Sequence, residues 1–206
     1  EVLVSYHEAG HTLTALLFKE FYDVKKVTIN ANTNGAGGYT LFTPKEKFMQ
    51  YPTKKYLLSN LIVTMGGRAA EILLFNKILK KPKNLNYDEN KIFDSFKDLD
   101  ITSGASQDLK QADKLARQYI ELFGIDIIDQ DLTKIIQNPD NPYLTLSETT
   151  KSEIDIYVTK LNNFALEKAI NILESNINLL NDIAKQLCKT RSIDSSYLKK
   201  LKIDYF

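Results

Sequence analysis

The first twenty residues carry apolar side chains on nearly every face of a predicted helix. No proline interrupts residues 2–18, and one stripe at helical spacing contains Val4, His7, His11, Thr14 and Phe18. The other faces carry Leu3, Tyr6, Leu13, Leu16 and Leu17. A helix that is apolar nearly all round is a buried helix, so we expect residues 1–20 to lie at the centre of the protein.

Two short segments after this helix have the composition of β-strands. Residues 24–29 are rich in β-branched side chains, and residues 37–43 form a second candidate strand that ends at Pro44. Residues 30–38 are rich in Asn and Gly, which favour turns. One interpretation of the pair is a structural hairpin. The other is an edge strand that binds an extended peptide by strand addition, with contacts from Gly37, Gly38, Tyr39, Thr40 and Leu41.

Helical periodicity dominates the rest of the chain. It predicts a long helix over residues 53–75, a second over 105–123 and further helices after Ser147, with a capping-box pattern at residues 150–153. Gly66 and Gly67 interrupt the first of these at a cost of about 1 kcal/mol each relative to Ala, which indicates close approach of another backbone. Asp194 is expected to cap a last short helix.

The pattern as a whole predicts a single domain over residues 1–206 that is mainly α-helical with a small β-sheet. We expect residues 1–124 to form one half, residues 125–146 to connect, and residues 147–206 to add C-terminal helices. Residues 77–90 lack periodicity and are expected to form a solvated loop within an insertion at about 77–99.

Composition is that of an ordinary globular protein, with 43% hydrophobic and 26% charged residues among 206. The net charge of +1 and the lack of a basic stripe make nucleic acid an unexpected partner. No run of 18 apolar residues occurs, so we expect no membrane-spanning helix here and expect this fragment itself to be soluble. Because the chain does not begin with Met, we expect it to be a domain of a longer protein.

The candidate chemistry lies in the first helix, where residues 7–11 fit the pattern H-E-x-x-H. Positions i and i+4 share a helix face, so His7 and His11 can bind one metal ion, and Glu8 can take a proton from water at that metal. The competing interpretations are a chance match and a pair of core histidines with satisfied hydrogen bonds. These are the only two histidines in the chain, and both lie in the motif, which favours the metal.

The third metal ligand cannot be a histidine, because none remains. The residues after His11 also exclude the longer form H-E-x-x-H-x-x-G-x-x-H. The residues alone therefore leave a carboxylate or Cys188 as the third ligand. Glu71 is either an ion-pair partner of Arg68 or a ligand, and Asp108 is either a favourably placed anion at a helix N-terminus or a ligand.

Four stretches, in this order, resemble the peptidase domain of FtsH-type ATP-dependent zinc proteases, including the mitochondrial and plastid forms. They are YHEAGH at residues 6–11, KVTI at 26–29, GGRAAE at 66–71 and TSGASQDL at 102–109. The first alone marks any zincin, whereas the set together is specific. The resemblance implies a zincin-like helical fold with Zn²⁺ bound by His7, His11 and Asp108, and with Arg68 and Glu71 in supporting roles.

The resemblance also implies what surrounds the domain. The family joins membrane helices, an AAA+ ATPase module and this peptidase into a hexamer, and the chain itself has no G-x-x-x-x-G-K-[ST] motif, so ATP and Mg²⁺ belong to the ATPase module. The insertion at about 77–99 departs from the family's short connection. We expect the full-length protein to be membrane-anchored, in an organelle rather than a bacterial membrane.

The expected function is that of a zinc metalloendopeptidase with Glu8 as general base, acting on unfolded or extracted polypeptides. The alternative is a catalytically inactive, FtsH-like module kept for hexamer formation. Damage to the motif would favour that alternative, but His7, Glu8, His11 and Asp108 are all present.

Overall fold

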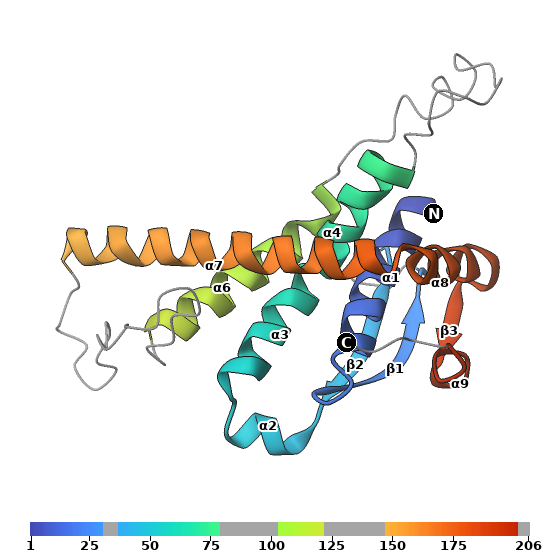
Figure 1. Cartoon of the computed structure of the whole chain (residues 1–206), viewed down its shortest axis with the longest axis horizontal. Helices are drawn as coiled ribbons and strands as arrows, with labels where there is room; N and C mark the ends of the chain where they lie inside the picture. Colours follow the sequence, from blue (N-terminus) through green and yellow to red (C-terminus); the bar gives the residue numbers. More distant parts are fainter. Residues whose placement is uncertain (31–36, 79–102, 122–146, 202–206) are drawn as a thin grey trace, which may run out of the picture.

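The computed structural model describes residues 1–30, 37–78, 103–121 and 147–201. In this part of the chain, helices pack around a central helix, and a three-stranded sheet lies against that helix (Figure 1). The predicted class, mainly α with a small sheet, is confirmed.

The central helix is α1, Val2–Leu17, which begins and ends close to the predicted bounds. Residues 8–15 are all buried, because α1 contacts α3, α4, α7 and α8 as well as both longer strands. The expectation of a buried helix is therefore confirmed.

The sheet has the strand order β2-β1-β3 and is antiparallel throughout. The strands are β1 (Tyr22–Thr28), β2 (Tyr39–Pro44) and β3 (Ser192–Asp194). Val27 of β1 lies opposite Thr40 of β2 on one side and Ile193 of β3 on the other. The predicted pairing of these two strands is confirmed, although β2 begins two residues after Gly37. The third strand was not expected.

The predicted long helix over residues 53–75 is wrong, because it is two helices that meet at Met65. They are α3 (Lys54–Thr64), capped by Thr53, and α4 (Gly66–Leu73), followed by a π-helical turn η1 (Leu74–Ile78). The bend between them is 46°. The predicted close approach is confirmed, since a Cβ on Gly66 would lie 2.8 Å from the carbonyl oxygen of Gly10 in α1.

Within the described part of the chain, no single helix has the length and apolar character needed to cross a membrane. The bent pair Lys54–Thr64 and Gly66–Asn76 meets those two criteria only when its halves are joined.

The remaining helices complete the described part of the chain. They are α2 (Glu46–Gln50), the 3₁₀ turn η2 (Ser103–Ala105), α6 (Ser106–Glu121), α7 (Glu148–Ser175), α8 (Ile177–Thr190) and α9 (Ser195–Leu198). Figure 1 shows α6 alongside the long α7, and α8 beside α1. Ser147, not Thr150, caps α7, because its hydroxyl accepts from the Thr150 amide; the capping box at residues 150–153 is wrong. Asp194 caps α9 as predicted.

Several sequence predictions fall outside the described residues. These are the connector at 125–146 and the insertion at 77–99 from residue 79 onward.

Candidate metal centre

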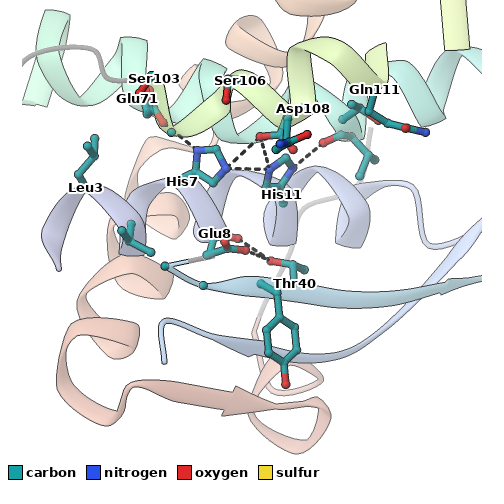
Figure 2. Close-up of a pocket in the computed structure, with 18 of the residues that line it drawn as sticks. Leu3, His7, Glu8, His11, Thr40, Glu71, Ser103, Ser106, Asp108 and Gln111 are labelled. Carbon is teal, nitrogen blue, oxygen red and sulfur yellow. Dashed lines mark hydrogen bonds and ion pairs between the residues drawn. The ribbon is translucent and has the colours of Figure 1, made fainter. Parts of the chain in front are cut away.

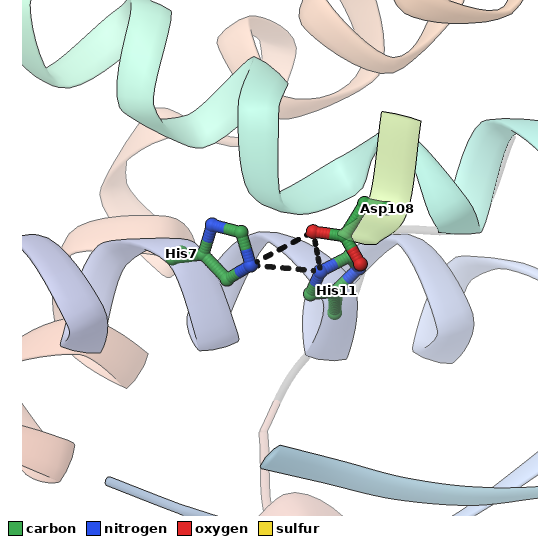
Figure 3. Close-up of side chains that lie close together, drawn as sticks. All are labelled: His7, His11 and Asp108. Atoms are coloured by element: carbon green, nitrogen blue, oxygen red, sulfur yellow. Dashed lines mark hydrogen bonds and ion pairs between the residues drawn. The ribbon is translucent and has the colours of Figure 1, made fainter. Parts of the chain in front are cut away.

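Two helices bring three candidate ligands to one point (Figure 3). His7 and His11 stand one turn apart on α1, and Asp108 lies in the first turn of α6. The Nε2 atoms of the two histidines are 3.2 Å apart. Oδ2 of Asp108 lies 3.1 Å from Nε2 of His7 and 3.4 Å from Nε2 of His11. The three residues predicted as ligands therefore converge through one atom each.

These separations suit a tetrahedral zinc site. Zn²⁺ holds nitrogen and oxygen ligands at about 2.0–2.1 Å, so two ligands at a tetrahedral angle are about 3.3 Å apart. The chemistry of the donor set, two imidazoles and a carboxylate, is also that of catalytic zinc sites. The residues present therefore fit the metal that the resemblance implies.

Glu71 fixes the ring of His7 from the side opposite the cluster. Oε1 of Glu71 lies 2.8 Å from Nδ1 of His7, and Arg68 donates from Nη1 to Oε2 at 3.3 Å. A carboxylate only accepts, so Nδ1 carries the proton and Nε2 of a neutral His7 keeps its lone pair for a ligand. Glu71 is 1% exposed, and it is not one of the three residues whose ligand atoms converge.

A backbone carbonyl does the same for His11. Nδ1 of His11 donates to the oxygen of Val63 at 2.8 Å. In an uninterrupted helix that oxygen would accept from the amide four residues on, which belongs to Gly67. Because α3 ends at Thr64, the Val63 oxygen has the Met65 amide near it rather than that of Gly67, and it accepts from the imidazole as well. No sequence pattern pointed to Val63.

The centre attracts positive charge. Burial acts to lower the pKa of His7, yet hydrogen bonds to Asp108 and Glu71 raise it to about 9 overall. Burial likewise acts to raise the pKa of Asp108, but hydrogen bonds from His11 and His7 hold it well below its usual range. A metal ion displaces the histidine protons. With both imidazoles neutral, the carboxylates of Glu8, Glu71 and Asp108 and the guanidinium of Arg68 leave a charge of −2, which a divalent cation neutralises.

Glu8 lies on the β2 side of α1, beside a cavity of about 690 Å³ (Figure 2). Its side chain is buried, and Oε2 accepts a hydrogen bond from the Thr40 hydroxyl at 2.8 Å. The cavity is lined by the three converging ligands and by four of the five residues predicted to contact substrate, namely Gly37, Gly38, Tyr39 and Thr40. Leu41 does not line it and is 48% exposed.

Gly67 is a site residue whose role the sequence did not reveal. A Cβ at this position would lie 2.6 Å from Nε2 of both His7 and His11. That is closer than non-bonded atoms approach, so the absence of a side chain makes room for the two imidazoles. The predicted cost of glycine in this helix was the available signal, but it did not say which atoms approach.

Cys188, the other third-ligand candidate from the residues alone, lies elsewhere. It sits on α8, where its Sγ donates to the Ser5 hydroxyl at 3.2 Å, and it lines a different cavity.

Comparison with known proteins identifies relatives along nearly the whole chain. The chain is 32% identical to the ATP-dependent zinc metalloprotease FtsH of Mycoplasmopsis pulmonis, over 96% of its length and 25% of that protein. It is 33% identical to the FtsH protein of Streptococcus pneumoniae serotype 4, over 97% of its length and 27% of that protein. It is 30% identical to the chloroplastic ATP-dependent zinc metalloprotease FTSH 1 of Arabidopsis thaliana, over 98% of its length and 26% of that protein.

The chain thus spans about a quarter of the length of these relatives. The family model that matches it is described as peptidase family M41, and the match covers residues 1–82 and 87–201. This agreement confirms the resemblance drawn from the four sequence stretches and the predicted peptidase class. With so complete a match, the chain belongs to peptidase family M41.

Proposed function

We propose that this chain is the zinc endopeptidase domain of a larger protease, with His7, His11 and Asp108 as the metal ligands. The observation that carries the proposal is the convergence of three ligand atoms, 3.1–3.4 Å apart, on one side of a buried helix. The shared name of the relatives, zinc metalloprotease, supports Zn²⁺ as the cofactor. We also propose that residues 1–206 act as a single peptidase domain.

Bound Zn²⁺ supplies a Lewis acid that polarises a peptide carbonyl and acidifies water. Glu8 is the general base of the proposal: its carboxylate accepts the proton of the attacking water and returns it to the leaving amine nitrogen. Glu71 and Arg68 hold the ring of His7, and the Val63 carbonyl holds that of His11, so that both Nε2 atoms face the ligand position.

The substrate in this proposal is an extended segment of an unfolded or extracted polypeptide. β2 is an edge strand, and its residues Tyr39 and Thr40, with Gly37 and Gly38 before it, line the same cavity as the ligand cluster. An extended chain pairing with this edge would place a peptide bond beside the cluster, and a folded chain has already paired its backbone.

For the whole protein, we propose a membrane-anchored, ATP-dependent protease in which an AAA+ ATPase module and a transmembrane segment accompany this domain, assembled as a homo-hexamer. The names of the relatives, which describe ATP-dependent proteases, support the ATPase partner. The relatives include bacterial proteins and a chloroplastic one, so they do not favour the organelle expected above, and we propose no particular membrane.

The rival function is an inactive module that only assembles hexamers. The intact donor set argues against it, since His7, His11 and Asp108 still converge through one atom each, as a bound metal ion requires.

Glu8→Gln tests the proposal. The variant should keep its zinc and its fold, and lose about 10²–10⁴-fold in hydrolysis of an unstructured peptide, because the amide cannot accept the proton. Glu153→Gln, a matched change at an exposed position on α7, should behave as the parent protein. A parent protein without activity at full zinc loading supports the rival module, whereas an active Glu8→Gln variant removes Glu8 as the base.

A further inference from the structure

The hydroxyl of Thr40 faces the carboxylate of Glu8 across the gap between β2 and α1 (Figure 2). Thr40 is half-buried in β2, whereas its strand neighbours Tyr39 and Leu41 are 39% and 48% exposed. The alternation of a strand thus turns Thr40 toward the helix. Its Oγ1 lies 2.8 Å from Oε2 of Glu8 and 3.2 Å from the main-chain oxygen of Glu8.

The single proton of this hydroxyl goes to the carboxylate. The main-chain oxygen of Glu8 already accepts a hydrogen bond from Thr12 at 2.7 Å. A carboxylate is the stronger acceptor, because a hydrogen bond to a charged oxygen is about twice as strong as one to a neutral oxygen. In the described part of the chain, Thr40 is the only residue whose side chain donates to this carboxylate.

The other oxygen of Glu8 lies beside a glycine. A Cβ on Gly38 would lie 3.1 Å from Oε1 and 3.0 Å from Cγ of Glu8, and 2.8 Å from the carbonyl oxygen of Thr28. The carboxylate therefore fits between the Thr40 hydroxyl and the bare backbone of Gly38. One oxygen is held by a donor, and the other is left to accept a proton.

We propose that Thr40 is a positioning residue for the general base: it holds Oε2 of Glu8 so that Oε1 is presented to the attacking water. This inference rests on the proposed role of Glu8. It also gives β2 two tasks, because the strand proposed to pair with the substrate carries the residue that orients the base.

Two pairs of substitutions separate positioning from packing. Thr40→Val keeps the β-branched shape and removes the hydroxyl, while Thr40→Ser and Thr40→Ala differ from each other by the hydroxyl alone. Thr159→Val is the matched control, since the Thr159 hydroxyl donates to the Asp155 carbonyl on an exposed face of α7. Zinc content, melting temperature, kcat and KM on an unstructured fluorogenic peptide are measured for each variant.

We expect Thr40→Val to lower kcat about 10–100-fold with KM within about twofold, because the loss falls on the transition state rather than on binding. Thr40→Ser should stay within about threefold of the parent kcat, with Thr40→Ala as impaired as Thr40→Val. Zinc content should be unchanged in all of them, and Thr159→Val should match the parent. Should Thr40→Val fail to fold, the comparison of Ser with Ala decides alone.

A double variant tests whether Thr40 acts through the carboxylate of Glu8 or independently of it. In a Glu8→Gln background, Thr40→Val should cause no further loss, because Thr40 acts through the missing carboxylate. Equal kcat for Ser and Ala, a loss carried by KM, or a full additional loss in the double variant would overturn the positioning role. If Glu8→Gln is itself active, the assignment of the base fails first.

Discussion

Nδ1 of His7 lies 2.8 Å from Oε1 of Glu71, and the other oxygen of that carboxylate accepts from Arg68. Both carboxylate oxygens of Glu71 thus have a partner, and Oε1 faces the ring nitrogen of His7 that is not in the cluster. Asp108 instead approaches Nε2 of both histidines. The two carboxylates touch the same ring, but through different nitrogens, and their removal should have different effects.

Asp108→Ala should therefore remove most of the zinc, which we expect at about one ion per chain in the parent protein. Glu71→Ala should leave the ion largely bound at micromolar zinc and weaken its affinity by about 10–100-fold, the usual cost of losing a partner behind a ligand. Metal analysis of the purified variants measures this. Asp113→Ala, at an exposed position farther along α6, is the control. The reverse order of zinc loss would exchange the two roles.

Gly67→Ala should weaken metal binding although it replaces none of the ligands. Its new Cβ would lie 2.6 Å from Nε2 of His7 and of His11, so the rings or α4 must shift, at a cost of about 1–3 kcal/mol. Zinc titration of the variant should show weaker binding than in the parent. Gly37→Ala is the matched change, since its Cβ would meet Val4 at an ordinary 3.4 Å, and it should bind zinc as the parent does. Unaltered affinity in Gly67→Ala would contradict the geometry described here.

Chelation should destabilise the domain. A cation neutralises the charge of −2 at the cluster, so only the folded state binds it well. With zinc at about 100 times its dissociation constant, the gain is about 2.7 kcal/mol, or about 5–10 °C in melting temperature for a chain of this size. Thermal melts with zinc and with a chelator measure the difference. The Asp108→Ala variant should show almost none, and a parent protein indifferent to chelation would exclude the site.

The isolated domain should distinguish folded from unfolded substrates. Pairing with the β2 edge needs free backbone groups, and unfolding a typical substrate costs about 5–15 kcal/mol. We expect cleavage of a permanently unfolded variant of a test protein and survival of its folded form over the same incubation. Gel analysis of both at equal concentration is sufficient. Similar cleavage of the two would mean that substrates do not enter as extended chains.

Local patterns predicted most elements that the structure contains. The apolar side chains on nearly every face of residues 1–20 predicted the buried helix α1. Asp194, which precedes a short apolar turn, was predicted as the cap of α9. These two predictions are correct because helical periodicity and capping are patterns of residues close together in the chain. Helical spacing has a limit at Leu109, which lies on one stripe with the buried Ala112 and Ala116 and is nevertheless 38% exposed.

Non-local contacts were harder to predict. β3 has three residues, too few for a visible alternation, and it exists only because residues 192–194 meet β1. In the site, the H-E-x-x-H motif predicted His7, Glu8 and His11. Asp108 was predicted from the family resemblance, because no pattern within α6 indicates that its first turn faces α1. The hydrogen bond from Thr40 to Glu8 joins two elements that the sequence predicted separately.

The break at Met65 has a consequence for how this protein tolerates substitution. The acceptor that orients His11 is a main-chain atom of Val63, and exchanging the Val63 side chain leaves that atom in place. A scan of substitutions would therefore report the Glu71 carboxylate behind His7. At Val63, whose side chain is fully buried, it would report lost packing and not the oxygen behind His11. The second ring is held by the course of the backbone between α3 and α4, and substitutions that shift this backbone, such as those at Gly66 and Gly67, would disturb it.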